Sequence, residues 1–195
     1  MVLERRRATY EDLLGVPEGK VAEIIDGELF VSPRPATPHA RATSVISREI
    51  GWFDGGSGSL PEPGGWWLLV EPELHFGADV LVPDLAGWRR ERMATIPDAP
   101  AITLAPGWVC EVISPSTGRL DRSRKMGVYG REGVAWLWLV DPLAHTIEIY
   151  RLESGRWVVA DTFGGWEVVR AQPFDAIELQ PGRWWLDPAP EPPPR

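Results

Sequence analysis

Residues 108–113 read Trp-Val-Cys-Glu-Val-Ile, a strongly apolar run that holds a single acid, Glu111. A run of this length and composition predicts a buried β-strand. Because side chains alternate along a strand, Glu111 and Ile113 share one face, while Cys110 lies on the other and is expected in the core. An unpaired buried charge costs several kcal/mol, so Glu111 needs a partner in the fold.

A second acid, Asp84, lies in the apolar run 80–86, which reads Val-Leu-Val-Pro-Asp-Leu-Ala. We expect strands over 66–76 and 80–86, with Asp84 inside the second. Two acids buried in neighbouring strands repel each other unless a positive group lies between them. Mg²⁺ prefers one or two carboxylates together with water and substrate phosphate. Asp84 and Glu111 are therefore interpreted as a pair of metal ligands. The alternative for each is a carboxylate in water at a strand end or in a buried ion pair.

A basic helix is predicted to follow, over 121–132. It carries Lys125, from which a cation could reach back to the acids, although a lone lysine on a helix is usually exposed. Asp121 is expected to cap this helix or to pair with Lys125 four residues later. Tyr129 shares the face of Lys125, where it either positions the lysine or packs as a half-buried residue.

The run 22–31 predicts a β-hairpin that turns at Asp26-Gly27, because both central residues of such a turn need positive φ. This register places Glu23 and Glu28 together on one face of the hairpin. The opposite face is wholly apolar, and we expect it to meet the core. Its residues are Ala22, Ile24, Leu29 and Val31.

A longer helix is predicted over 39–53, with an apolar stripe at helical spacing. His39 and Glu49 lie on the same stripe. His39 is a candidate for contacting a phosphate or moving a proton, and the alternative is a packed or capping residue. Ser114, which follows the strand 108–113, either hydrogen-bonds a ligand or caps a turn.

The remaining elements complete an α/β pattern. They are a short helix capped by Thr9, a loop over 54–65, a fully buried strand over 136–140, a hairpin of strands 146–151 and 157–160 that turns near Ser154-Gly155, and a proline-rich disordered tail over 189–195. This order predicts a mixed sheet with helices against it, in a single domain over 1–188.

Composition narrows the class of protein. The 195 residues are 44% hydrophobic and include one cysteine, which excludes an internal disulfide and a cysteine-based zinc site. No apolar run approaches the roughly 20 residues of a membrane span. The N-terminus has arginines but no apolar stretch behind them, so it does not resemble a secretory signal. We therefore expect a cytoplasmic protein.

The net charge of −8 argues mildly against permanent binding to nucleic acid. Arginines nevertheless cluster over 89–92 and again over 119–131, where the alternative is a solvated surface. Of the 11 tryptophans, those in predicted buried strands are expected in the core, and Trp66, Trp67, Trp184 and Trp185 could line an interface.

Motifs spread along the chain match one family in the same order. They are Glu23-Ile24-Ile25-Asp26-Gly27-Glu28, His39, Val82-Pro83-Asp84, Glu111-Val112-Ile113-Ser114-Pro115-Ser116-Thr117, Asp121, Lys125, Tyr129, Gly133-Val134 and Trp138-Leu139-Val140-Asp141-Pro142. Over roughly 9–186 the chain resembles the Uma-two family (domain of unknown function eight-twenty) of restriction-endonuclease-like proteins, in the PD-(D/E)XK nuclease superfamily. The resemblance implies a restriction-endonuclease-like core, a mixed β-sheet flanked by helices, with an additional N-terminal hairpin.

The resemblance also implies roles for individual residues. Asp84 and Glu111 would bind Mg²⁺ or Mn²⁺, with the backbone carbonyl of Val112 as a further ligand. The superfamily pattern has a lysine where this chain has Ile113. Lys125 would replace it, orienting the attacking water or stabilising charge on phosphorus. A further acid would come from one of three candidates, Glu23, Glu28 and Glu49.

We therefore predict an endonuclease that depends on Mg²⁺ or Mn²⁺ and hydrolyses the phosphodiester bonds of DNA. DNA is the partner expected from the resemblance, with no membrane association and with a homodimer as a candidate assembly. One alternative is a catalytically inactive binding or assembly module with the nuclease fold, which Ile113 and the acidic net charge favour. Another is a metal-dependent enzyme acting on a small phosphate compound.

Overall fold

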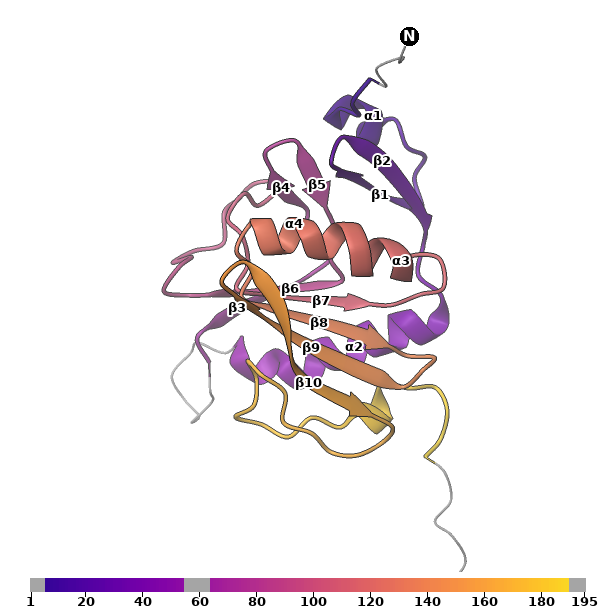
Figure 1. Ribbon diagram of the computed structural model, residues 1–195, viewed down its shortest axis with the longest axis vertical. Helices are drawn as coiled ribbons and strands as arrows, with labels where there is room; N and C mark the ends of the chain where they lie inside the picture. Colours follow the sequence, from indigo (N-terminus) through magenta and orange to yellow (C-terminus); the bar gives the residue numbers. More distant parts are fainter. Residues whose placement is uncertain (1–5, 55–63, 190–195) are drawn as a thin grey trace, which may run out of the picture.

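The computed structural model describes residues 6–54 and 64–189, and in these the chain forms two β-sheets (Figure 1). The six-stranded sheet has the order β10-β9-β8-β7-β6-β3, and the four-stranded sheet has the order β2-β1-β5-β4. The large sheet contains β3 (Trp66–Val70), β6 (Leu85–Arg89), β7 (Trp108–Val112), β8 (Trp136–Asp141), β9 (Thr146–Glu153) and β10 (Arg156–Gly164). The small sheet contains β1 (Lys20–Ile25), β2 (Glu28–Pro33), β4 (Leu74–Phe76) and β5 (Asp79–Leu81).

Helices cover both faces of the large sheet (Figure 1). On one face lies α2 (Thr37–Ile50), which continues into the 3₁₀ turn η1 (Gly51–Phe53). On the other lies a continuous helix made of α3 (Gly118–Leu120), the π-turn η2 (Asp121–Lys125) and α4 (Met126–Arg131). Two short elements complete the list, α1 (Tyr10–Leu14) and the 3₁₀ turn η3 (Pro181–Arg183). In the described part of the chain, no helix has the length and hydropathy of a membrane span.

The strand β7 confirms the predicted alternation. Cys110 and Val112 face α2, and Val109 and Ile113 belong to the core on the α4 side. Its neighbour β8 runs parallel to β7, and every other strand pair is antiparallel, so the sheet is mixed as predicted. The helix 118–131 makes the connection that a parallel pair requires.

The predicted strands 66–76 and 80–86 are each divided between the two sheets. The chain leaves the large sheet after β3, forms the β4–β5 hairpin of the small sheet, and returns as β6. Pro72 and Pro83 lie at the two crossings, where proline cannot donate to a sheet ladder. Asp84 therefore lies in the bend just before β6 and not inside a strand, which corrects the expectation above.

The N-terminal hairpin has the predicted register, with Ile25 opposite Glu28 and a turn at Asp26 and Gly27, which both have positive φ. The prediction for its faces is confirmed only in part, because Ile24 of the apolar face is 1% exposed. Val31 is 49% exposed, whereas Ile25 is fully buried and Glu23 is only 5% exposed. Glu23 is buried because, as shown below, a buried lysine neutralises it, whereas Glu28 on the same face is exposed.

Several other predictions are confirmed. The apolar stripe of the helix 39–53 is buried against the large sheet. Thr9 caps α1, and the hairpin β9–β10 turns at Ser154 and Gly155. The helix predicted over 121–132 begins three residues earlier, at Gly118. The four tryptophans left open include three core residues, Trp66, Trp184 and Trp185. Apart from its ends, the predicted loop 54–65 lies outside the described residues, as does nearly all of the tail 189–195.

Candidate active site

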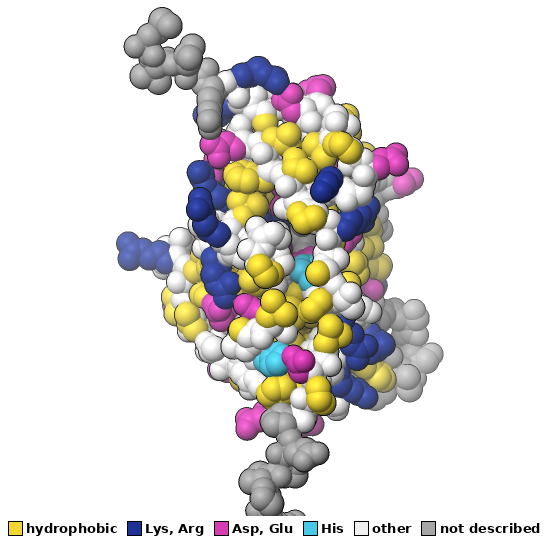
Figure 2. Space-filling model, turned by 90° about the vertical axis from the view of Figure 1, so that its right-hand side faces the viewer, with side chains coloured by type: hydrophobic (Ala, Val, Ile, Leu, Met, Phe, Trp, Pro, Cys, Tyr) yellow, Lys and Arg dark blue, Asp and Glu magenta, His cyan; other side chains and the backbone are white. Residues whose placement is uncertain are grey.

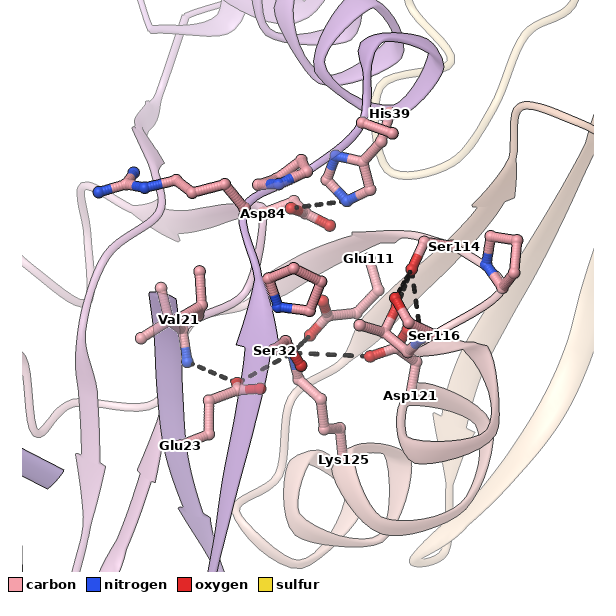
Figure 3. Close-up of a pocket in the computed structure, with 17 residues that line it drawn as sticks. Val21, Glu23, Ser32, His39, Asp84, Glu111, Ser114, Ser116, Asp121 and Lys125 are labelled. Atoms are coloured by element: carbon pink, nitrogen blue, oxygen red, sulfur yellow. Dashed lines mark hydrogen bonds and ion pairs between the residues drawn. The ribbon is translucent and has the colours of Figure 1, made fainter. Parts of the chain in front are cut away.

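A pocket of about 230 Å³ opens where the small sheet meets the end of β7 (Figure 3). The small sheet contributes β1 and the end of β2. The bend before β6 contributes Asp84, and β7 contributes Glu111. Figure 3 shows Glu23 and Val21 on one side of the pocket and Ser116 and Asp121 on the other, with Glu111 between them. Carboxylates far apart in sequence therefore share one cavity.

Lys125 lies at the bottom of this pocket. Its ammonium group is 2.8 Å from Glu111 Oε1 and 3.0 Å from Glu23 Oε1, and the residue is only 3% exposed. The alternative of an exposed lysine is thus wrong. A π-turn over 121–125 brings Lys125 to this position, since the extra residue in the turn changes the direction of the side chains that follow. Such π-turns are frequent at functional sites.

Two further residues of the same helix hold these groups. Asp121 Oδ1 is 3.7 Å from Lys125 Nζ, so Asp121 pairs with the lysine. The hydroxyl of Tyr129 donates to Glu111 Oε1 at 2.5 Å, and this bond is fully buried. Tyr129 therefore positions the acid itself, and Lys125 and Tyr129 together fix one oxygen of Glu111.

Asp84 is held from two directions. Its Oδ2 accepts a 2.7 Å hydrogen bond from the backbone N–H of Val112, and its Oδ1 is 3.1 Å from His39 Nε2. The first bond ties the bend at Asp84 to the end of β7, where Glu111 lies. His39 stands in the first turn of α2, and Figure 3 shows its ring directed at Asp84.

The site contains more negative than positive charge. Four carboxylates, those of Glu23, Asp84, Glu111 and Asp121, line the pocket with two cationic side chains, Lys125 and Arg34. Burial raises the pKa of Glu111 well above its ordinary value, and Lys125 offsets only part of this effect. Burial also raises the pKa of Asp121. Burial alone would lower the pKa of Lys125, but Glu111 and Glu23 raise it well above its ordinary value, so the lysine stays charged.

Hydroxyl groups form one wall of the pocket. Ser114 Oγ lies 3.0 Å from the hydroxyl of Ser116 and 2.9 Å from that of Thr117, and it accepts a hydrogen bond from the Thr117 N–H. Ser114 thus organises the turn between β7 and α3. The same three side chains line the pocket, so their hydroxyls are also available to a ligand.

Of the three candidates for a further acid, the structure brings only Glu23 to the pocket. Glu49 lies elsewhere, because its Oε2 accepts hydrogen bonds from the Gln180 N–H at 3.1 Å and the Trp184 indole at 3.0 Å. Glu28 is exposed and lies 3.8 Å from Arg124. Glu49 shares the apolar stripe because it anchors the C-terminal segment, not because it faces the acids.

The structure also shows site residues that the sequence did not reveal. Ser32 near the end of β2 and Arg34 in the link after it both line the pocket. A proline-rich link has no periodicity that would assign its side chains to a face, so no signal marked them. The arginine cluster 89–92 is not part of the pocket, and Arg89 and Arg90 stack on Trp66 and Trp67.

The donor set suits a hard divalent cation on two carboxylates. In the described ranges, no group of three or more His, Cys, Asp or Glu side chains forms a ready cluster of metal ligands. Among the described residues that line the pocket there is one histidine, His39, and no cysteine, so its acidic donors are carboxylates. Mg²⁺ commonly uses one or two carboxylates and completes its shell with water and substrate oxygens. The excess of buried carboxylate in the pocket matches that chemistry.

Comparisons with known proteins identify a family and a similar fold. The model of the family Uma2, described as "Putative restriction endonuclease", matches residues 7–182. Among solved structures, one similar fold is the crystal structure of a putative nuclease belonging to DUF820 from Anabaena variabilis. It has a TM-score of 0.72 and 21% sequence identity, and the match covers 91% of this chain and 97% of that chain. No curated protein matches the chain.

Proposed function

The chain belongs to the Uma2 family, and on this premise we propose that it is a nuclease that hydrolyses DNA phosphodiester bonds with the help of Mg²⁺ or Mn²⁺. The observation that supports the proposal best is the convergence of Asp84, Glu111 and Lys125 in one pocket. Three chain segments bring these residues together, and the excess negative charge suits a divalent cation.

We assign the cation to Asp84 and Glu111, with the backbone carbonyl of Val112 as a further ligand. When bound, the ion would lower the pKa of a bound water and offset charge on the phosphate. The residues of the chain keep this arrangement in place. The Val112 N–H fixes one oxygen of Asp84, and Tyr129 fixes one oxygen of Glu111.

Lys125 and His39 supply the remaining chemistry. Hydrolysis forms a bond from the water oxygen to phosphorus, and the water gives up one proton. The bond from phosphorus to the leaving sugar oxygen breaks, and that oxygen takes up one proton. The Lys125 ammonium, beside Glu111 in the pocket, can stabilise the charge that grows on the phosphoryl oxygens. His39 lines the same pocket and can hold a proton beside Asp84.

Plasmid nicking in the presence of Mg²⁺ or Mn²⁺ tests this proposal. We expect Asp84→Asn and Glu111→Gln to reduce the rate at least about a hundredfold, as loss of one stabilising contact to a transition state typically does. Both substitutions keep the shape of the side chain and remove its negative charge. Nicking that survives both substitutions would refute the assignment of the site.

A catalytically inactive binding module is the second candidate, and two observations favour it. Ile113 replaces the lysine of the superfamily pattern, and the acids already have partners of their own, such as His39 for Asp84. An inactive module predicts that Mn²⁺ will not raise the melting temperature, whereas a metal-binding nuclease predicts a rise.

The third candidate, an enzyme for small phosphate compounds, predicts activity on mononucleotides that is insensitive to salt. A cytoplasmic location and a homodimer stay predictions.

A further inference from the structure

Glu23 connects two parts of the site through a single oxygen. The residue lies in β1 and is only 5% exposed. Its Oε1 is 3.0 Å from the Lys125 ammonium, and the same oxygen accepts a 2.8 Å hydrogen bond from the Val82 N–H. Lys125 belongs to the helix 118–131, and Val82 belongs to the link between β5 and β6. One atom of β1 thus joins this helix to that link.

The link that Glu23 holds also carries Asp84. Only Pro83 separates Val82 from Asp84, and its ring fixes the backbone φ, so a shift at Val82 passes on to the bend. At the other end of the bend, Asp84 Oδ2 accepts a hydrogen bond from the Val112 N–H. The bend is therefore held between β1 and β7, and Glu23 fixes the position of the lysine relative to Asp84.

The position of the Lys125 ammonium depends on the acids around it, because a lysine side chain has a long and flexible stem. Figure 3 shows Glu23 and Asp121 on opposite sides of the pocket, with Glu111 between them. The ammonium is 2.8 Å from Glu111 and 3.7 Å from Asp121. If Glu23 loses its charge, these two acids draw the ammonium towards themselves. A misplacement of about 1 Å in a catalytic group can reduce the rate about a hundredfold.

The affinity for DNA should depend on other residues. Figure 2 shows the face that carries the pocket, with a hollow near its middle and Lys and Arg side chains gathered around it. Exposed cations of this kind attract the DNA backbone, whereas Lys125 is only 3% exposed and acts only on a phosphate that has reached the pocket. We propose, on the basis of the nuclease function above, that Glu23 is a positioning residue, which holds Lys125 in place relative to Asp84 for the reaction at phosphorus.

The test measures plasmid nicking by the full-length chain in Mn²⁺ over a range of plasmid concentrations, with rates per folded molecule. Glu23→Gln keeps an oxygen that can accept from the Val82 N–H and removes the charge that faces Lys125. We expect kcat to fall about ten- to a hundredfold. The KM for plasmid and the affinity for Mn²⁺, measured by titration calorimetry, should stay within about twofold of the wild type. Glu28→Gln is the matched control, because Glu28 is exposed on the same hairpin, and it should leave all three values unchanged.

A second comparison shows whether Glu23 acts through the lysine. In the Lys125→Met background, Glu23→Gln should reduce kcat by less than about twofold, because the group that Glu23 positions is already gone. A purely structural role would give the same loss in both backgrounds. Glu23→Asp, which keeps the charge on a shorter side chain, should have a kcat between those of the wild type and Glu23→Gln. It takes the place of Glu23→Gln in both backgrounds if that variant does not fold.

The inference is overturned by an unchanged kcat in Glu23→Gln or by an equal loss in the two backgrounds. A weaker affinity for Mn²⁺ would also overturn it, because Glu23 would then be a metal ligand, and so would a raised KM alone, which would assign Glu23 to DNA binding. Failure of the proposed function would look different. The wild type itself would then nick no plasmid in Mn²⁺, while Glu23→Gln and Lys125→Met would still show coupled losses in urea denaturation.

Discussion

Replacing Lys125 by methionine should destabilise the protein severely in the absence of divalent cations. The ammonium is 3% exposed and lies 2.8 Å from Glu111, 3.0 Å from Glu23 and 3.7 Å from Asp121. Methionine fills a similar volume, so the change removes charge and leaves three buried acids to repel one another. Breaking a buried ion pair in this way costs about 3–5 kcal/mol.

The free energy of unfolding is measured by urea denaturation in EDTA, followed by circular dichroism. Arg170→Met is the control, because Arg170 pairs with Glu178 on the surface, where both side chains are more than half exposed. An exposed pair of this kind contributes about 0–1 kcal/mol. A loss below about 1 kcal/mol in Lys125→Met would refute the reasoning, since the lysine would then not be what neutralises the acids.

Two further measurements separate the electrostatic cause from packing. In Glu111→Gln combined with Lys125→Met, the loss should be smaller than the sum of the two single losses, because the double variant buries one negative charge fewer. The loss in Lys125→Met should also shrink as the pH falls. Burial raises the pKa of Glu111 in the folded protein above its unfolded value. The folded state therefore binds a proton at a pH where the unfolded state does not, and its relative stability rises as the pH falls towards that unfolded value.

Three other predictions test neighbouring parts of the structure. Tyr129→Phe removes the buried donor to Glu111 and should cost about 1–3 kcal/mol in urea denaturation; a neutral effect would contradict its positioning role. Glu49→Ala should lower the free energy of unfolding by a similar amount, since the Trp184 indole loses its acceptor. Plasmid nicking per folded molecule should not change, and a loss of nicking would mean that Glu49 takes part in the active site. Burial raises the pKa of Tyr150 to about 12. In a spectrophotometric titration its phenolate should therefore form at a higher pH in the native than in the unfolded protein. The free energy of unfolding should fall as the pH rises above about 10. Coincident native and unfolded titration curves would exclude this shift.

The position of the pocket between two sheets explains why its acids come from such distant segments. The bend at Asp84 crosses from the small sheet to the large one, and Glu23 accepts a 2.8 Å hydrogen bond from the Val82 N–H in the same link. Glu23 therefore joins β1 to this crossing and also contacts Lys125. The small sheet is thus part of the site and not only an appendage to the core.

Much of the fold follows from the sequence because its signals are local. The alternation along 108–113, the turn at Asp26-Gly27 and the apolar stripe of 39–53 depend on neighbours within a few residues. The two anomalous acids, Asp84 and Glu111, also stand out by themselves, because a charge inside an apolar run is costly wherever the strand lies. Strand, turn and helix signals of this kind survive in almost any tertiary setting.

The tertiary structure alone decided the relations between segments. The burial of Glu23 in the hairpin depends on Lys125, about a hundred residues away, which neutralises it. For the same reason the sequence did not distinguish Glu23, Glu28 and Glu49 as the further acid of the site. Tertiary packing places Glu23 in the pocket and Glu49 against Trp184. Burial of a charge is favourable only beside its partner, and the identity of that partner is a property of the three-dimensional arrangement and not of the local sequence.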